Sequence, residues 1–301
     1  MKIAIAGFGA EGASNYAYYA LQGNHELTIV ERANKPIPPG VRVLTDENAL
    51  ANLYGYDLVV RGGSILPNDI STDGKIWSAT NEFFEHCPAP IIGVTGTKGK
   101  GTTVALIASI LSAAGRTVHV VGNIGVPPLD VLSRITKSDI VVFEMSSFQL
   151  LDIERSPHVA VVLMIEADHM DIHNDMTEYI GAKRNIVVFQ TDRDICLYHP
   201  TNEYAAWVAS AAPGSTYRYG VSQDEQVYVK DGYFCKGRVR ICPISVLQLR
   251  GQHNSENACA AISAAWCYTN DAFAIENGLR LFGGLPHRLK LIGTIDGVQY
   301  Y

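Results

Sequence analysis

The sequence predicts an α/β protein of two domains, each built on a mostly parallel sheet, with a smaller β-rich portion near the end. A short apolar strand at 2–6 runs into Gly7–Gly12, whose glycines have the G-x-G-x-x-G spacing. A second apolar strand begins at Ile91, enters the glycine-rich segment 96–103 and is followed by an Ala-rich helical pattern. A chain of 301 residues is also long for one domain.

Residues 1–88 are predicted to form a Rossmann-like domain. The strand 2–6, a helix from about residue 13 to 21 and a strand at 26–30 make a βαβ unit, and Glu31 stands where a ribose-binding acid is expected. The glycines could instead only allow a helix to pack closely on a strand, and the neighbouring Arg32 could favour a phosphate or be solvated. The candidate ligand residues are Gly7, Phe8, Gly9, Ala10, Glu11, Gly12, Glu31, Arg32 and, after a strand at 57–60, Gly62 and Gly63.

Residues 89–301 are predicted to form the second domain, which begins with a phosphate-binding loop. Glycines at 96 and 99 let backbone N–H groups converge, and the following helix N-terminus adds a positive dipole end. The usual pattern is G-x-x-x-x-G-K-[ST], but here its first glycine is Val94 and Gly101 follows the lysine, so Thr102 or Thr103 must supply the hydroxyl. A plain glycine-rich connection is the alternative. The candidate triphosphate residues are Gly96, Thr97, Lys98, Gly99, Lys100, Gly101, Thr102 and Thr103.

Polar residues follow two further apolar strands of this domain. Glu144 comes directly after the strand 140–143 and could hold Mg²⁺ beside phosphates, or it could be an exposed strand-end glutamate. His169 lies between Asp168 and Asp171 after the strand 159–164, where a site role competes with a structural one. Lys183, taken alone, reads as a surface helix lysine.

Composition limits the remaining choices. The formal charge of −6 leaves no basic face, so nucleic acid is not an expected partner. Six cysteines without CxxC spacing are typical of free thiols in a reducing compartment. The start shows no signal peptide and no apolar run is long enough to span a membrane, which favours a cytoplasmic protein without membrane contact. We expect a monomer. Short β patterns between 216 and 249 predict the β-rich portion, and a helix is expected to begin after Gly251–Asn254 and to run to about residue 268.

Taken together, these motifs resemble the Mur ligase family, the ATP-dependent amino-acid ligases of peptidoglycan synthesis. Within the family they are most similar to the branch that adds D-glutamate to UDP-N-acetylmuramoyl-L-alanine, and the string Glu144–Leu150 is the most specific of them. The resemblance covers the whole chain and rests on these segments: Gly7–Gly12, Thr95–Lys100, Gly122–Gly125, Glu144–Leu150, Asp168–Asp171, Ala182–Lys183, Gly251–Asn257 and Gly284–Arg288.

The resemblance implies a role for individual residues. Lys100 and Thr102 would hold ATP, with Asn254, Asn257 and Arg288 on its base or phosphates. Mg²⁺ would be bound by Thr102, Glu144, His169 and a carbamylated Lys183, and the catalytic set would be Lys100, Lys183 and His169. The muramoyl substrate would face Asn123, Ser146 and Gln149, while the first domain would hold UDP and not a dinucleotide.

The resemblance also implies the reaction. The γ-phosphoryl group of ATP would pass to the substrate carboxylate, and the D-glutamate amine would then attack the acyl phosphate. Clustered cationic and metal charge is what this chemistry needs from the protein. The family's third domain, which carries the amino acid, would follow Tyr301, so the chain read here is expected to bind substrates but to be incompetent in ligation.

Several positions depart from the family pattern. Gly101 replaces Ser or Thr, Met164 replaces Asn, Ala167 replaces an acid or proline, and the residues from Arg61 to Ser64 replace a Ser-Pro-Gly loop. Two other functions remain open: another ligase of the superfamily, such as one acting on folate, and a two-domain nucleotide-binding or regulatory protein without ligase activity.

Overall fold

The computed structural model describes residues 1–301 except Asn34, His169, Asp171, 221–225, Arg250, 285–292, 296–297 and Tyr301. The first part of the chain forms a sheet of five parallel strands in the order β3-β2-β1-β4-β5. Its elements are β1 (Lys2–Ala6), α1 (Ala10–Leu21), β2 (Glu26–Val30), β3 (Arg42–Leu44), β4 (Leu58–Arg61), β5 (Lys75–Ser78) and α2 (Ala79–His86).

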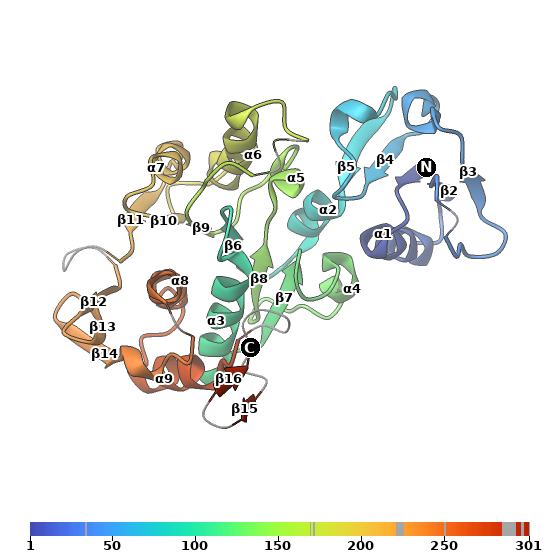
Figure 1. Ribbon diagram of the computed structural model, residues 1–301. Helices are drawn as coiled ribbons and strands as arrows, with labels where there is room; N and C mark the ends of the chain where they lie inside the picture. The colour runs from blue at the N-terminus through green and yellow to red at the C-terminus, as the bar shows by residue number, and fades with distance from the viewer. Residues whose placement is uncertain are drawn as a thin grey trace.

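A second parallel sheet follows, with six strands in the order β11-β10-β9-β6-β8-β7 (Figure 1). Its strands are β6 (Ile91–Thr95), β7 (Val118–Gly122), β8 (Ile140–Glu144), β9 (Val159–Val162), β10 (Ile195–Tyr198) and β11 (Ser215–Arg218). The helices of this part are α3 (Lys100–Ala113), α4 (Pro128–Leu132), α5 (Ser147–Leu150), α6 (Met176–Val188), α7 (Glu203–Ala209), α8 (Gln252–Ala265) and α9 (Ala272–Leu281). The predicted α/β fold with mostly parallel sheets is confirmed.

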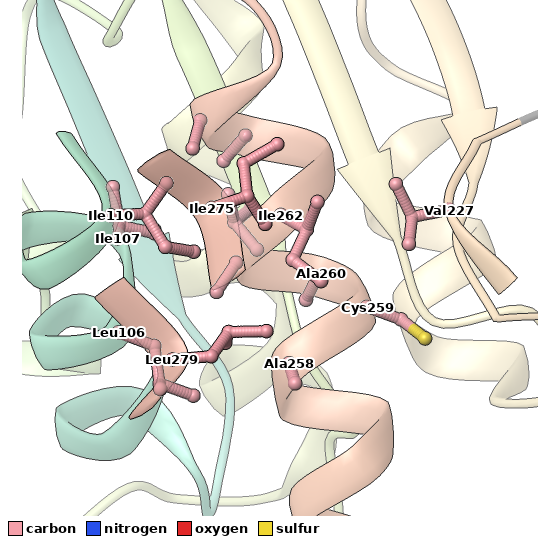
Figure 2. Packing of buried hydrophobic residues seen from close by; sticks show 14 of the residues in the cluster. Leu106, Ile107, Ile110, Val227, Ala258, Cys259, Ala260, Ile262, Ile275 and Leu279 are labelled. Atoms are coloured by element: carbon pink, nitrogen blue, oxygen red, sulfur yellow. The ribbon is translucent and has the colours of Figure 1, made fainter. Parts of the chain in front are cut away.

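The six-stranded sheet is buried on both faces, because alternate residues of its strands enter two different hydrophobic clusters. Ile140 and Val142 of β8 point to the cluster that contains α3, α8 and α9, whereas Val141 and Phe143 point to the cluster that contains α6 and α7. Figure 2 shows α3, α8 and α9 meeting in the first cluster. This double burial holds the strand ends, and the loops that follow them, in fixed positions.

The first part of the chain packs against this sheet through α2. Phe83 and Phe84 lie against Phe143, with ring centroids 5.7 Å and 5.8 Å apart. Both phenylalanines are buried in the same cluster as the strand residues around them. The five-stranded and six-stranded sheets are therefore joined by an apolar contact and not only by the connecting chain.

The predicted β-rich portion divides between two sheets. β11 joins the six-stranded parallel sheet, while β12 (Tyr228–Lys230), β13 (Tyr233–Lys236) and β14 (Val239–Pro243) form an antiparallel sheet. Their tight turns use left-handed backbone, as at Gly232 with φ of 78°. A short antiparallel pair, β15 (Gly293–Ile295) with β16 (Val298–Tyr300), follows.

Some boundaries differ from the sequence-based expectation. α1 begins at Ala10, three residues before the expected start, and α8 ends at Ala265, three residues before the expected end. β3 and β5 were not expected, since each has only three or four residues and no clear apolar alternation. Within the described part of the chain, no helix combines the length and apolar character needed to cross a membrane.

Candidate active site at the carboxyl edge of the six-stranded sheet

The segment after β6 forms a tight loop that ends in the first turn of α3. Gly96 has φ of 145° and Gly99 has φ of 86°, values that side chains disfavour. A Cβ on Gly96 would lie 2.7 Å from Leu163 Cβ, so neighbouring structure also requires glycine there. The predicted strand, loop and helix are all present, and the N-terminus of α3 directly follows the loop.

Two lysine side chains converge on one carbonyl of this loop. Lys100 Nζ donates to Gly96 O at 3.0 Å and to Thr97 O at 3.0 Å, and Lys183 Nζ donates to the same Gly96 O at 3.2 Å. The Lys183 ammonium also lies 4.4 Å from the centre of the Tyr179 ring. Two lysine amines are thus held within hydrogen-bonding distance of the loop backbone.

The interpretation of Lys183 as a surface lysine is wrong. Its side chain is 1% exposed, because α6 packs against the sheet with this residue facing the loop. Burial and then the nearby charge of Lys100 lower the pKa of Lys183 to about 7, although Asp168 opposes them. A substantial neutral fraction near pH 7 makes the amine nucleophilic. Spacing alone could not reveal this, since the burial comes from the packing of the whole helix.

The loop after β9 is joined to the phosphate loop through Thr97. Its Oγ1 donates to Glu166 O at 2.9 Å and accepts from the Glu166 N–H, and its own N–H donates to Met164 O at 2.9 Å. Although Met164 replaces the asparagine of the family pattern, its backbone carbonyl still accepts the hydrogen bond from Thr97. His169 itself lies outside the described residues, so its predicted position beside the phosphate loop stays a prediction.

Glu144 lies at the carboxyl end of β8, which pairs with β6 so that Val94 stands opposite Glu144. The side chain is 5% exposed, so the alternative of an exposed strand-end glutamate is wrong. Thr102 is partly exposed whereas Thr103 is fully buried, which favours Thr102 as the hydroxyl that reaches a bound ion. A carboxylate and a hydroxyl are oxygen donors of the kind that Mg²⁺ takes together with phosphate oxygens and water, so these residues fit the ion.

The first two turns of α8 carry the two candidate asparagines, and they bring Asn257 to the phosphate loop. A Cβ on Gly99 would lie 2.5 Å from Asn257 Oδ1, so this amide touches the loop backbone. Asn257 Nδ2 donates to Asn254 Oδ1 at 3.5 Å, which keeps the pair together. The third predicted nucleotide contact, Arg288, lies outside the described residues.

A cavity of about 280 Å³ joins the lysines to the predicted substrate residues. Its walls are helix and loop residues from both parts of the chain: Glu11, Gly63 and Ser64 from the first part, and Lys100, Asn123, Ser146, Ser147, Phe148, Gln149, Ile172, Tyr179 and Lys183 from the second. Seven of the residues singled out from the sequence thus share one cavity. Ser64, Ser147, Phe148, Ile172 and Tyr179 were not singled out. Tyr179 could have been found from its i, i+4 spacing to Lys183 on one helix.

Several cavity walls are held by local hydrogen bonds. Ser146 and Gln149 form a capping box at the start of α5, with Ser146 N donating to Gln149 Oε1 at 3.0 Å. Gly63 N donates to Glu11 Oε2 at 2.9 Å, and burial raises the pKa of Glu11 while this bond and Arg61 act against it. The cavity thus contains the Glu11 side chain as well as the two lysines.

A chain of polar contacts lies behind Ser147. His173 Nε2 is 2.9 Å from Ser147 Oγ, and His173 Nδ1 is 3.2 Å from Glu178 Oε1. Phe148 stacks on the imidazole, with ring planes 8° apart. Burial acts to raise the pKa of Glu178, but hydrogen bonds from His173 and Asn174 lower it overall. These contacts fix α5 against the beginning of α6.

A second cavity, of about 460 Å³, lies at the carboxyl edge of the five-stranded sheet. Its walls are Gly7, Val30, Glu31, Arg32, Glu47, Asn48, Leu50, Ala51, Ile65 and Asp69. Five of the predicted ligand residues line neither of these two cavities: Phe8, Gly9, Ala10, Gly12 and Gly62. A Cβ on Gly12 would lie 2.0 Å from Gly7 O, so this glycine is required for close packing of α1, as the structural alternative proposed.

Glu31 is occupied by contacts within the chain. Its carboxylate accepts from Phe8 N at 2.7 Å, from Ala33 N at 2.9 Å and from Lys35 Nζ at 2.6 Å. Burial acts to raise the pKa of Glu31, but the Lys35, Ala33 and Phe8 hydrogen bonds lower it to about 2. The predicted ribose acid is thus ionised and braces the Gly7–Gly12 loop.

Gly99→Ala is expected to weaken nucleotide binding and to destabilise the chain by at least about 1 kcal/mol. An alanine would have to adopt φ of 86°, which residues with a Cβ disfavour, and its Cβ would clash with Asn257. Chemical denaturation and nucleotide titration would measure both effects. Gly181→Ala is the matched control, because this helical glycine has open space around its Cβ position and should be neutral or stabilising. Equal behaviour of the two variants would contradict the requirement for a left-handed residue at 99.

A family model supports this site. The Mur ligase middle domain matches residues 94–265, a region that begins in β6 and contains the phosphate loop, Glu144, Lys183 and the α8 asparagines. The matched region is more than half of the 301 residues.

Curated proteins of similar sequence carry a common name. The UDP-N-acetylmuramoylalanine–D-glutamate ligase of Clostridium kluyveri is 34% identical over 284 residues, covering 91% of this chain and 61% of its own length. The enzyme of that name from Clostridium acetobutylicum is 35% identical over 325 residues, covering 100% of this chain and 69% of its own length. The matched region thus covers slightly less than two thirds of the length of the first relative and slightly more than two thirds of the second.

Solved structures share the fold at lower identity. The UDP-N-acetylmuramate:L-alanyl-γ-D-glutamyl-meso-diaminopimelate ligase of Neisseria meningitides has a TM-score of 0.65 at 19% identity, covering 94% of this chain and 98% of that one. The UDP-N-acetylmuramate–alanine ligase of Thermotoga maritima has a TM-score of 0.60 at 19% identity, covering 98% and 72%. The solved structures thus show the shared fold, while the matched middle domain and the relatives at 34–35% identity show that this chain belongs to the Mur ligase family.

Proposed function

We propose that this protein is an ATP-dependent ligase that adds D-glutamate to UDP-N-acetylmuramoyl-L-alanine in peptidoglycan precursor synthesis. The observation that carries the proposal is the 280 Å³ cavity, in which Lys100 and Lys183 of the phosphate site face Asn123, Ser146 and Gln149. A phosphoryl donor and an acceptor carboxylate held at these two sets of residues would meet in one enclosed space. The names of the similar curated proteins support this choice of substrates.

The triphosphate of ATP is assigned to 96–103. The backbone N–H groups of the loop and the start of α3 would bind phosphate oxygens, and Lys100 would stabilise charge on the transferred phosphoryl group. Asn254, Asn257 and Arg288 are proposed to contact the base or phosphates. Glu144, Thr102, His169 and a modified Lys183 would hold Mg²⁺, which when bound neutralises charge on the phosphates.

Lys183 is proposed to carry a carbamate. Its neutral amine would attack CO₂, forming an N–C bond and releasing one proton, and the added carboxylate would become an oxygen ligand for the ion. The neutral form is accessible near pH 7 because burial and Lys100 lower its pKa.

The UDP-linked substrate is assigned to both cavities. Uridine diphosphate would occupy the 460 Å³ cavity beside Gly7, Glu31 and Arg32, and the muramoyl end would enter the 280 Å³ cavity at Gly63 and Ser64. Residues 1–88 would then be the UDP-substrate domain and 89–301 the ATP domain. We place the protein in the cytoplasm, where ATP is available.

Calorimetric titration tests the proposal. The chain should bind ATP·Mg²⁺ and UDP-N-acetylmuramoyl-L-alanine. In a separate phosphate-release assay, the UDP substrate should increase the release of phosphate from ATP. NAD is the comparison ligand, because the Gly7–Gly12 spacing alone is compatible with a dinucleotide. Binding of NAD without binding of the UDP substrate would contradict the assignment, and binding of ATP alone would favour a nucleotide-binding protein without ligase function.

A further inference from the structure

Arg61 is a fully buried cation at the end of β4. In the sheet it stands opposite Ala6 of β1 and Ser78 of β5, so its backbone is fixed on both sides. A buried charge is costly unless it is paired and hydrogen-bonded. The hydrogen-bond and ion-pair partners of the guanidinium group therefore indicate its structural role.

The guanidinium joins three separate segments. Nε donates to Asp152 Oδ2 at 2.7 Å, and Nη2 donates to Asp152 Oδ1, which makes a bidentate ion pair. Nη1 donates to Ile65 O at 3.1 Å, and Nη2 also donates to Phe148 O at 2.8 Å. One planar group thus holds a loop after β4, the α5 helix and the turn that follows it.

Asp152 is itself held in place from the other side. Asn81 Nδ2 donates to Asp152 O at 2.8 Å, and Asn81 Oδ1 accepts from Glu154 N at 2.8 Å. Asn81 is buried in α2. The carboxylate that pairs with Arg61 is therefore anchored to a helix that packs against both sheets.

The two carbonyls that Arg61 holds belong to two chain segments that contribute walls to the 280 Å³ cavity. Ile65 follows Gly63 and Ser64, and Phe148 lies between Ser146 and Gln149. Arg61 itself lines neither of the two cavities described above. It lies behind these walls and is hydrogen-bonded to both segments.

We propose that Arg61 is a positioning residue for the UDP-linked substrate: its guanidinium clamps the 62–65 loop to the α5 turn, so that one substrate molecule can contact both. This rests on the proposed function, because that substrate is the ligand assigned to both walls. Among the described residues, the hydrogen bonds of the Arg61 guanidinium go to Asp152, Ile65 and Phe148 and not to the proposed ATP site at 96–103. Loss of the clamp should therefore weaken binding of the UDP substrate more than binding of ATP.

Arg61→Lys is the central variant, because lysine keeps the charge but lacks the planar fork. Its dissociation constant for UDP-N-acetylmuramoyl-L-alanine should rise at least about tenfold, since small displacements of positioning groups have large effects, while that for ATP·Mg²⁺ changes less than about twofold. Arg61→Met should bind the UDP substrate more weakly still, so that the lysine variant retains part of the affinity that the methionine variant loses. Asp152→Asn, which removes the partner's charge at nearly constant shape, should resemble Arg61→Lys.

Lys75→Met is the matched control. The Lys75–Glu154 pair, at 3.1 Å, also joins the first sheet to the turn after α5, but both side chains are about half exposed. Exposed pairs contribute little, so both affinities should stay at the wild-type values.

Three results would overturn the clamp. These are wild-type substrate affinity in folded Arg61→Lys, an equal loss of substrate and ATP affinity, and unfolding of every Arg61 and Asp152 variant, which would leave a purely structural role. A wild-type chain that fails to bind the UDP substrate would instead contradict the proposed function, and the role of the clamp with it.

Discussion

Lys100→Ala is expected to reduce the affinity for ATP·Mg²⁺ by about 10- to 100-fold, since a hydrogen bond to a charged group contributes about 1.5–3 kcal/mol. The Lys100 ammonium already lies 3.0 Å from Gly96 O and Thr97 O, directly over the loop that would hold the phosphates. Isothermal titration calorimetry at fixed salt would measure the change, with circular dichroism to show that the variant is folded.

Lys137→Ala is the control for this loss, because Lys137 is an exposed lysine just before β8, at the opposite end of the strand from the loop. Its affinity for ATP·Mg²⁺ should equal that of the wild type. If Lys100→Ala bound ATP·Mg²⁺ as tightly as Lys137→Ala, the assignment of the triphosphate to 96–103 would be wrong.

Lys183→Met is expected to unfold at a temperature several degrees higher than the wild type at pH 7, in buffer purged of CO₂. The native pKa of Lys183 is lowered to about 7 from an ordinary value of 10.5, first by burial and then by Lys100. The unfolded chain therefore binds more protons between these values, so Lys183 destabilises the fold fully below about pH 7 and progressively less as pH rises to 10.5. Each pKa unit corresponds to about 1.4 kcal/mol.

The diagnostic measurement is the pH dependence of thermal unfolding from pH 7 to pH 10. The advantage of Lys183→Met over the wild type should shrink across this range, partly offset throughout by the loss of the hydrogen bond to Gly96 O. Lys100→Ala should also reduce the slope in the wild-type background, because it removes one cause of the lowered Lys183 pKa. Parallel pH profiles for wild type and Lys183→Met would show that the buried amine does not titrate in this window.

Much of the phosphate site could be predicted because it is local in sequence. Gly96, Gly99 and Lys100 lie within one strand–loop–helix unit, and the positive φ angles of the glycines follow from the turn that such a unit needs. The position of Glu144 at a strand end could also be predicted from the sequence, because a short apolar run marks a buried strand. Neighbouring parallel strands then end at the same edge of the sheet.

Roles that depend on long-range packing could not be read in this way. Arg61 stood out only as a departure from the family pattern, and its partners Asp152 and Phe148 are about ninety residues away. Sequence spacing carries no information about such pairs.

The sequence by itself therefore determined the two α/β units, the phosphate loop and the set of polar residues that follow the strands, because these depend on short-range periodicity and turn chemistry. The tertiary structure alone decided that Lys183 is buried and that Glu11 and Gly63 share a cavity with Lys100. Those outcomes arise from the packing of α6 and of the first sheet onto the second. Burial, and with it the lowered pKa of Lys183, is a property of the whole packed fold and not of any single segment.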